Sequence, residues 1–232
     1  MPRPVGCHPL WPNVYLHVFE GPEPGPTVLV QAGIHGDEIA GVHALEELLE
    51  EGLRPDRGRL LVVPVMNPPA YRAQQRAPAG GLDLNRQFPG DPSHERYEPR
   101  LARVFMELVE EEDVALMATL HESKKRYDPE VHPSFGQTLV YGVQPCPPLL
   151  TDVVDALNAH RASDDEAWAT QYYPVATSST EVIVDAIGCI GVCVETWMGF
   201  DLSRRVAMQR EVVLRLLTGF GTLLPADAPP GH

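Results

Sequence analysis

Short apolar runs alternate with longer amphipathic segments along most of the chain. Several of the runs carry Val, Ile and Leu on both faces, which is typical of strands covered on both sides of a sheet. The runs predict six β-strands, at residues 14–19, 27–33, 59–66, 114–120, 137–143 and 189–195.

The amphipathic segments predict four helices, at residues 38–51, 94–112, 149–161 and 202–217. Asp37 is expected to cap the first of them, and Gly52 to follow its last turn. Strands and helices in this succession predict an open, mostly parallel sheet between layers of helices.

The length of 232 residues is sufficient for one large α/β domain and short for two. We expect the domain to span residues 1–224 and the Pro- and Ala-rich residues 225–232 to form a flexible tail. Two long Pro- and Gly-rich stretches, 67–92 and 124–136, predict loops of the length that often carries function.

The formal net charge of −14 argues against nucleic acid or an anionic membrane as a partner. None of the four cysteines forms a Cys-x-x-Cys pair, so we expect buried free thiols in a reducing cytosol. The N-terminal residues show no secretory signal, and no apolar run approaches the roughly 18 residues of a membrane span. These features predict a cytoplasmic protein.

Polar residues follow four of the predicted strands. His35, Asn67, His121 and Glu195 each lie at or just beyond the C-terminal end of a different strand. Ligands bind at that edge of open α/β sheets. We therefore expect these side chains to meet at one site.

The segment Gln-Ala-Gly-Ile-His-Gly-Asp-Glu, ending at Glu38, places an imidazole and a carboxylate three residues apart. Side chains with this spacing can point at the same spot, and both are good zinc ligands. With His121 they form the ligand set of a catalytic zinc site, in which a fourth position stays open for water.

Glu195 closes an apolar run, and such a carboxyl is expected to be partly desolvated with a raised pKa. It is the best candidate for the general base that takes a proton from water and returns it to a leaving amine. The alternative is a structural ion pair with an Arg.

A second group of candidates lies in the loop 67–92. Asn85 and Arg86 can grip a substrate carboxylate, because Arg offers a planar fork and Asn a further donor. Arg76, upstream in the same loop, could stabilise a developing oxyanion, and Arg72 competes for that role.

These motifs carry a family resemblance. The chain resembles the zinc carboxypeptidase superfamily and is closest to its succinylglutamate desuccinylase/aspartoacylase branch, which His-Gly-Asp-Glu and Asp-Leu-Asn-Arg followed by Phe-Pro-Gly favour. The matching motifs, in order, are His35-Gly36-Asp37-Glu38, Asn67-Pro68, Asp83-Leu84-Asn85-Arg86, His121 and Glu195.

The resemblance implies a single α/β domain with a central mixed sheet and helices on both faces. It implies one Zn²⁺ per chain on His35, Glu38 and His121, with Glu195 as the base. It also implies a mobile tyrosine that closes on the substrate, at Tyr173 or, as an equally valid choice, Tyr172. The roles it implies for the remaining residues are carboxylate binding by Asn85 and Arg86, carbonyl polarisation by Arg76, and a side-chain pocket near Ser179, Thr180 and Glu181.

Three departures from the family pattern shape the expected function. The chain stops too early for the C-terminal β-rich domain of aspartoacylase-like deacylases. Asn67 is followed by Pro-Pro-Ala where carboxypeptidases have Pro-Asp-Gly, and residues 122–125 fit neither branch clearly.

We predict a zinc-dependent hydrolase for a small-molecule or short-peptide substrate with a free carboxylate, first an N-acyl amino acid deacylase. The alternatives are a carboxypeptidase or peptide amidase, an esterase, and a non-catalytic binder of zinc or a ligand. The oligomeric state stays open.

Overall fold

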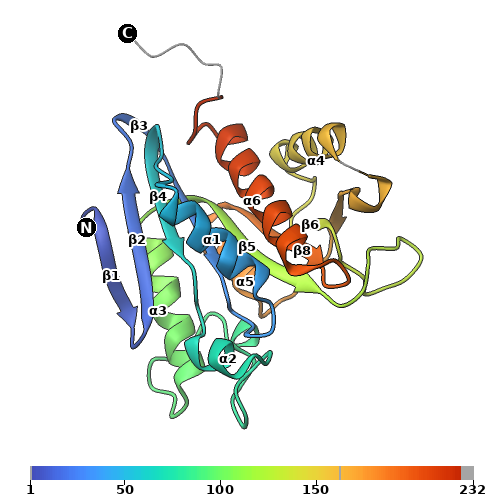
Figure 1. Ribbon diagram of the computed structural model, residues 1–232. Coiled ribbons are helices and arrows are strands. Elements are labelled where there is room, and N and C mark those ends of the chain that lie inside the picture. Colours follow the sequence, from blue (N-terminus) through green and yellow to red (C-terminus); the bar gives the residue numbers. More distant parts are fainter. Residues whose placement is uncertain (1, 162, 226–232) are drawn as a thin grey trace.

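The computed structural model describes residues 2–161 and 163–225, which form an α/β domain around one eight-stranded sheet (Figure 1). The order across the sheet is β1-β2-β4-β3-β5-β8-β6-β7. The predicted tail lies outside the described residues, apart from Pro225. The strands are β1 (Gly6–Trp11), β2 (Val14–Glu20), β3 (Glu23–Ala32), β4 (Arg57–Val63), β5 (Val114–Ser123), β6 (Thr138–Tyr141), β7 (Ala169–Tyr172) and β8 (Ile190–Trp197).

The sheet is mixed, as predicted. Its centre, β4-β3-β5-β8, is parallel, as is the outer pair β6-β7, whereas β1, β2 and the β6-β8 pair are antiparallel. Strand β3 shows why the centre needs cover on both faces. Val28 and Val30 join one apolar cluster, and Leu29 between them joins the other.

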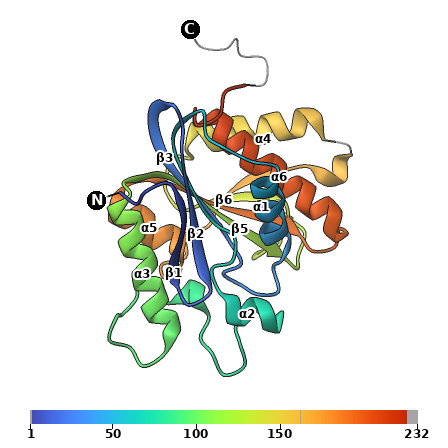
Figure 2. The same ribbon diagram turned by 60° about the vertical axis from the view of Figure 1, so that its left-hand side comes forward.

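Helices cover both faces of the sheet (Figure 2). The cluster around Val28 includes residues of α1 (Ala40–Glu50), α4 (Pro148–His160) and α6 (Leu202–Gly219). The cluster around Leu29 includes α3 (Tyr97–Glu111) and Ile183 of α5 (Ser179–Ile187). Three short helical segments complete the fold: α2 (Pro68–Ala73), η1 (Leu84–Arg86) and η2 (Asp164–Glu166).

Each predicted strand and helix has a counterpart, with bounds shifted by a few residues. The predicted cap at Asp37 is wrong. Helix α1 begins only at Ala40, and its N-cap residue Ile39 makes no side-chain capping bond. Gly52 does follow the helix in a left-handed conformation, with φ of 85°. The elements missed are β1, β7, α2, α5 and the two short 3₁₀ turns.

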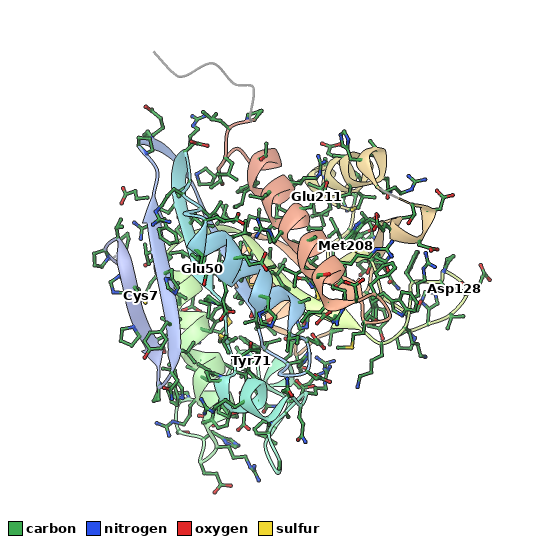
Figure 3. All side chains as sticks on the ribbon, viewed as in Figure 1. Cys7, Glu50, Tyr71, Asp128, Met208 and Glu211 are labelled. Atoms are coloured by element: carbon green, nitrogen blue, oxygen red, sulfur yellow. The ribbon has the colours of Figure 1, made fainter. Side chains whose placement is uncertain are left out.

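The four cysteines are free thiols, as predicted, but the burial predicted for them holds only for Cys189. Cys7 is exposed on the outer strand β1 (Figure 3), whereas Cys189 is buried. None of the described helices combines the length and apolar character needed to cross a membrane.

Candidate active site

The C-terminal edge of the central strands carries a cavity of about 420 Å³. His35, His121 and Glu195 line it, as expected from their places at strand ends. Asn67, the fourth residue expected there, does not. It caps α2 instead, where its side chain accepts a hydrogen bond from Ala70 N. Its Oδ1 also accepts a hydrogen bond from the hydroxyl of Tyr97 at 2.8 Å.

His35 and Glu38 lie in the turn between β3 and α1, so Glu38 precedes the helix that was predicted to begin with it. Gly36 lets this turn pack on α2, because a Cβ atom there would lie 1.9 Å from the carbonyl oxygen of Ala70. The glycine of His-Gly-Asp-Glu is therefore needed for close approach of two backbones.

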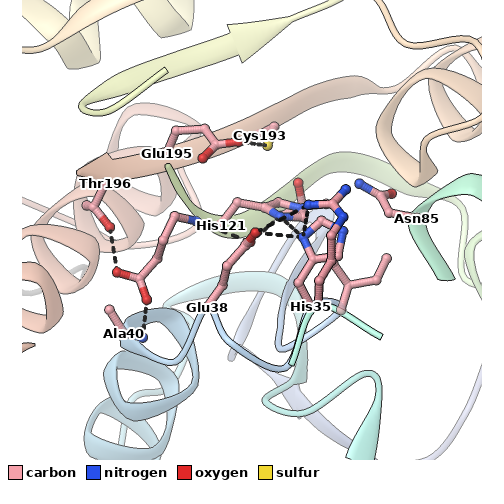
Figure 4. Close-up of polar contacts among 12 residues, drawn as sticks. His35, Glu38, Ala40, Asn85, His121, Cys193, Glu195 and Thr196 are labelled. Atoms are coloured by element: carbon pink, nitrogen blue, oxygen red, sulfur yellow. Dashed lines mark hydrogen bonds and ion pairs between the residues drawn. The ribbon is translucent and has the colours of Figure 1, made fainter. Parts of the chain in front are cut away.

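Three buried side chains converge in this turn and on β5 (Figure 4). Nδ1 of His35 lies 2.8 Å from Oε1 of Glu38, and Nδ1 of His121 lies 2.7 Å from Oε2 of the same carboxylate. The two Nδ1 atoms are 3.2 Å apart. All three side chains thus aim ligand atoms at one point.

The donor atoms of this trio fit a zinc ion. Each residue offers one ligand atom, and these atoms lie within 4.8 Å of one another. Two imidazole nitrogens and a carboxylate oxygen suit Zn²⁺ and leave a further coordination position free. The Nε2 atom of His121 is buried without a hydrogen-bond partner, so nothing else in the described chain engages the far side of that ring.

The electrostatics of the trio are dominated by Glu38. Burial disfavours a charged imidazole at His35, but the carboxylates of Glu38 and Asp83 outweigh it and raise the pKa of His35 to about 9. Burial prevails at His121, whose pKa is lowered. Burial would raise the pKa of Glu38, yet the two imidazoles hold it far below its ordinary value. Without metal, the site therefore holds an anionic Glu38 beside a protonated His35.

Glu195 lies next to the trio on the neighbouring strand. β5 and β8 pair in parallel with His121 opposite Glu195. Ligand-type atoms of His121, Cys193 and Glu195 also fall within 4.8 Å of one another. Burial, and then repulsion from Glu38, raise the pKa of Glu195 to about 8. Among the described residues no Arg forms an ion pair with Glu195, so the structural ion pair considered above is not seen.

The carboxylate of Glu195 has one weak contact. Oε1 accepts from the thiol of Cys193 at 3.7 Å, and Oε2 is buried without a partner. A buried carboxylate oxygen with no donor is costly unless a ligand or water satisfies it. Because Glu195 lines the cavity, a molecule bound there can satisfy this oxygen.

Asp83 connects the trio to the loop that contains Asn85 and Arg86. Its Oδ1 lies 3.3 Å from Nε2 of His35, and its Oδ2 accepts from Nε and Nη2 of Arg76 at 2.9 and 2.8 Å. Nη1 of Arg76 is left facing the trio, 3.7 Å from Oε1 of Glu38. Arg76 lines the cavity, and the competing Arg72 does not.

Asn85 and Arg86 form the short helical turn η1 at the wall of the cavity. Oδ1 of Asn85 accepts from the backbone N–H and the hydroxyl of Ser179, at 2.9 and 3.1 Å. The amide oxygen is thereby engaged, which leaves the NH₂ group for a ligand. Arg86 is exposed and bonds to the carbonyl oxygen of Asn85 at 2.9 Å.

Of the two candidate tyrosines, Tyr173 lines the cavity and Tyr172 does not. The ring of Tyr173 packs edge-on against Phe135, with centroids 4.9 Å apart, and stays 37% exposed. Tyr172 packs on Tyr141 instead. Trp197 at the end of β8 is also absent from the lining, whereas Met198 is present.

Residues to which the sequence analysis gave no role hold β5 and the start of α1 in place next to the site. The carboxylate of Glu122 is fully buried, accepts from Ala40 N at 2.9 Å and pairs with Arg205. Gln209 donates to the carbonyl oxygen of His121 at 2.7 Å. Only the fold brings α6 to this strand, so spacing along the chain gave no signal for these contacts.

Solved structures with the same fold show which structural class the domain belongs to. The domain has a zinc carboxypeptidase-like α/β fold. It superposes on tripeptide-bound Csd4 from Helicobacter pylori with a TM-score of 0.78 at 19% identity, over 90% of this chain and 56% of that chain. It superposes on a succinylglutamate desuccinylase/aspartoacylase from Rhodobacter sphaeroides with a TM-score of 0.71 at 24% identity. That superposition covers 91% of this chain and 60% of the other.

Within that class, the family described as "Succinylglutamate desuccinylase/Aspartoacylase catalytic domain" matches residues 24–127. An N-alpha-acetyl-L-2,4-diaminobutyric acid deacetylase from Halomonas elongata is 49% identical over 70 residues, 29% of this chain and 20% of the relative. Succinylglutamate desuccinylase from Yersinia pestis is 33% identical over 120 residues, 47% of this chain and 35% of the relative. The matched segments thus span 20% and 35% of these curated relatives' length. The resemblance indicated by the motifs is confirmed.

Proposed function

We propose that the protein is a zinc-dependent hydrolase that cleaves an amide bond in a substrate bearing a free carboxylate. The observation that carries this proposal is the convergence of His35, Glu38 and His121 on one point, with Glu195 opposite His121 on the next strand. A ligand trio open to a cavity and a desolvated carboxylate beside it are what metal-assisted hydrolysis requires.

The residues present divide the work as follows. His35, Glu38 and His121 would hold the metal, and zinc bound there supplies Lewis acidity to water and to the substrate carbonyl. Glu195, with its raised pKa, accepts the proton of the attacking water and delivers it to the leaving amine.

Two further groups position and stabilise the substrate. Arg76 is held by Asp83 with Nη1 toward the trio, where the guanidinium stabilises negative charge developing on the carbonyl oxygen. Asn85 and Arg86 bind the free carboxylate, and Tyr173 lines the same cavity.

The leading substrate class is N-acyl amino acids. The local motifs and the desuccinylase/aspartoacylase catalytic-domain match support this assignment. The second candidate is a carboxypeptidase or peptide amidase, favoured by the superposition on a Csd4 structure that contains a bound tripeptide.

One experiment tests the proposal and orders the two candidates. The purified protein is loaded with one equivalent of zinc and assayed on N-acetyl and N-succinyl amino acids beside short peptides with a free C-terminus. We expect turnover of the acyl amino acids. Release of an amino acid from the peptides alone would place the carboxypeptidase reading first.

Two variants separate metal binding from chemistry. His35→Ala should lose both zinc and turnover, whereas Glu195→Gln should keep zinc and lose about 10²–10⁴-fold in kcat. Glu130→Gln, an exposed acid in the 124–136 loop, is the matched control and should change neither. Stoichiometric zinc with no hydrolysis on any amide or ester would instead identify a non-catalytic binder.

A further inference from the structure

Glu181, on the first turn of α5, lines the cavity without serving the metal trio. Val140, Val175 and Thr180 line the cavity as well, so two aliphatic side chains and a threonine share the lining with this acid. An acid in such a place is either part of the local fold or a contact for a ligand.

The carboxylate of Glu181 has no partner within residues 2–161 and 163–225. No hydrogen bond and no ion pair engages its two carboxylate oxygens, whereas its backbone N–H donates to Oγ of Ser178 at 3.3 Å. Burial, and then the nearby Asp185, raise the pKa of Glu181 above its ordinary value. No cation of the described chain compensates the charge.

The local fold does not use this carboxylate either. Ser178 and Glu181 stand in the Ser-x-x-Glu spacing of a capping box, in which the Glu would accept from the backbone N–H of the Ser. That N–H donates instead to the carbonyl oxygen of Val175 at 2.9 Å. Only the Ser half of the box is formed, and the Glu half is free for another role.

Gly142 supplies the space that the carboxylate occupies. A Cβ atom at Gly142 would lie 1.6 Å from Oε1 of Glu181 and 2.1 Å from its Oε2. Any side chain at position 142, immediately after β6, would therefore displace the acid. The glycine and the acid together place negative charge on this part of the cavity wall.

Arg76 and Arg86 line the same cavity and are the candidates for the reacting carbonyl and the free carboxylate. The cavity thus has cationic groups for one part of an amino-acid ligand and an unpaired anion for another. We propose that Glu181 is a specificity residue that accepts an ammonium group on the side chain of the leaving amino acid. This inference rests on the proposed function and names its substrate class: derivatives of diamino acids.

The test compares substrates that differ only in the side-chain ammonium. Nα-acetyl-lysine is assayed against N-acetyl-norleucine, and alanyl-lysine against alanyl-norleucine, so that both substrate classes are covered. We expect the wild type to favour the lysine substrate by about tenfold or more in kcat/KM, and Glu181→Gln to bring the ratio close to one. Equal kcat/KM values in the wild type, or a ratio that Glu181→Gln leaves unchanged, would overturn the assignment.

Two more variants distinguish a direct contact between Glu181 and the ammonium group from the effect of overall negative charge. Gly142→Ala should lower the lysine-to-norleucine ratio as Glu181→Gln does, because the added methyl displaces the carboxylate. Asp185→Asn removes an exposed charge from the same helix and should keep the wild-type ratio. A fall in that ratio of the same size for Asp185→Asn would show that the preference comes from overall charge rather than from Glu181.

If no substrate is turned over, binding of free amino acids tests the ammonium site separately from the proposed hydrolase activity. Free lysine and norleucine are titrated into the zinc-loaded protein by calorimetry. Tighter binding of lysine that disappears in Glu181→Gln supports the ammonium site even where hydrolysis is absent. Equal affinities in the wild type overturn it, whatever the catalytic result.

Discussion

Oδ1 of Asp83 lies 3.3 Å from Nε2 of His35, on the side of the ring opposite the nitrogen that faces Glu38. A carboxylate in this place orients a metal-binding imidazole and makes it a better ligand. The same carboxylate binds Arg76 and caps the turn that begins at Leu84. One acid thus connects the candidate metal ligand, the candidate oxyanion group and the turn proposed to bind the substrate carboxylate.

Removing the charge of Asp83 should weaken metal binding. We expect Asp83→Asn to lower zinc affinity by about 10–100-fold, because the imidazole of His35 loses the group that orients it. Competition with a chromophoric chelator measures this affinity. Asp91→Asn, in an exposed stretch of the same chain region, is the control and should bind zinc like the wild type. Wild-type affinity in Asp83→Asn would show that His35 is oriented by other contacts.

Zinc binding should release a proton at neutral pH. The pKa of His35 is raised to about 9 without metal, so below that pH its imidazole carries a proton that zinc must displace. Apparent affinity should therefore fall as the pH is lowered from 9, by up to tenfold per unit from this group. Calorimetry at pH 7 in two buffers of different ionisation enthalpy gives the number of protons released.

His35 should contribute about one proton at pH 7, decreasing toward zero well above pH 9. Glu195, whose pKa is raised to about 8, adds to the total where bound zinc ionises it. His160→Ala, at the exposed end of α4, should leave it unchanged. No proton release at pH 7 would contradict a protonated His35 in the metal-free site.

Arg86 should affect substrate binding more than chemistry. Hydrogen bonds to charged groups contribute about 1.5–3 kcal/mol, so Arg86→Ala should raise KM by about 10–100-fold with little change in kcat. The effect should vanish for a substrate whose carboxylate is replaced by a carboxamide. Steady-state kinetics on the acid and the amide measure both parameters. Equal losses on the two substrates would assign Arg86 a structural role.

The pair between Arg205 and Glu122 should be important for stability. The carboxylate is fully buried, and loss of one partner from a buried ion pair costs about 3–5 kcal/mol. We expect Arg205→Met to lower the free energy of unfolding near the lower end of that range, since Ala40 N still donates to Glu122. Urea denaturation of the metal-free protein measures the change.

The same helix provides a matched comparison. Arg210 pairs with Glu47 and Glu51, both of which are half or more exposed, and such pairs contribute about 0–1 kcal/mol. Arg210→Met should therefore be nearly neutral. Similar losses for the two variants would mean that Glu122 is not uniquely dependent on Arg205.

The predictable part of the fold was the part with strong apolar periodicity. Strand β1 escaped because it is an edge strand with exposed residues, and β7 because it has only four residues. Helix α2 begins with two prolines and is six residues long. Helix α5 could have been found, since Ser178 and Glu181 give a start signal and Gly188 follows its last turn in a left-handed conformation.

The candidate site was predictable to the extent that its residues end strands. His35, Glu38, His121 and Glu195 were chosen from their positions after apolar runs, and the structure brings them together. The partners of Asp83 and Glu122 depend on which loops and helices meet in three dimensions. Asn67 was misplaced for the same reason, because β4 ends at Val63 and the chain turns into α2 before reaching the cavity.

The ligand trio draws on segments that are distant in the chain, since His35 and His121 are separated by 86 positions. Their nitrogens meet only because β3 and β5 lie side by side in the centre of the sheet. A chain that has collapsed without aligning these two strands cannot present the three ligand atoms together. Uptake of zinc by the refolding polypeptide would then report, in real time, when the middle of the sheet acquires its native register.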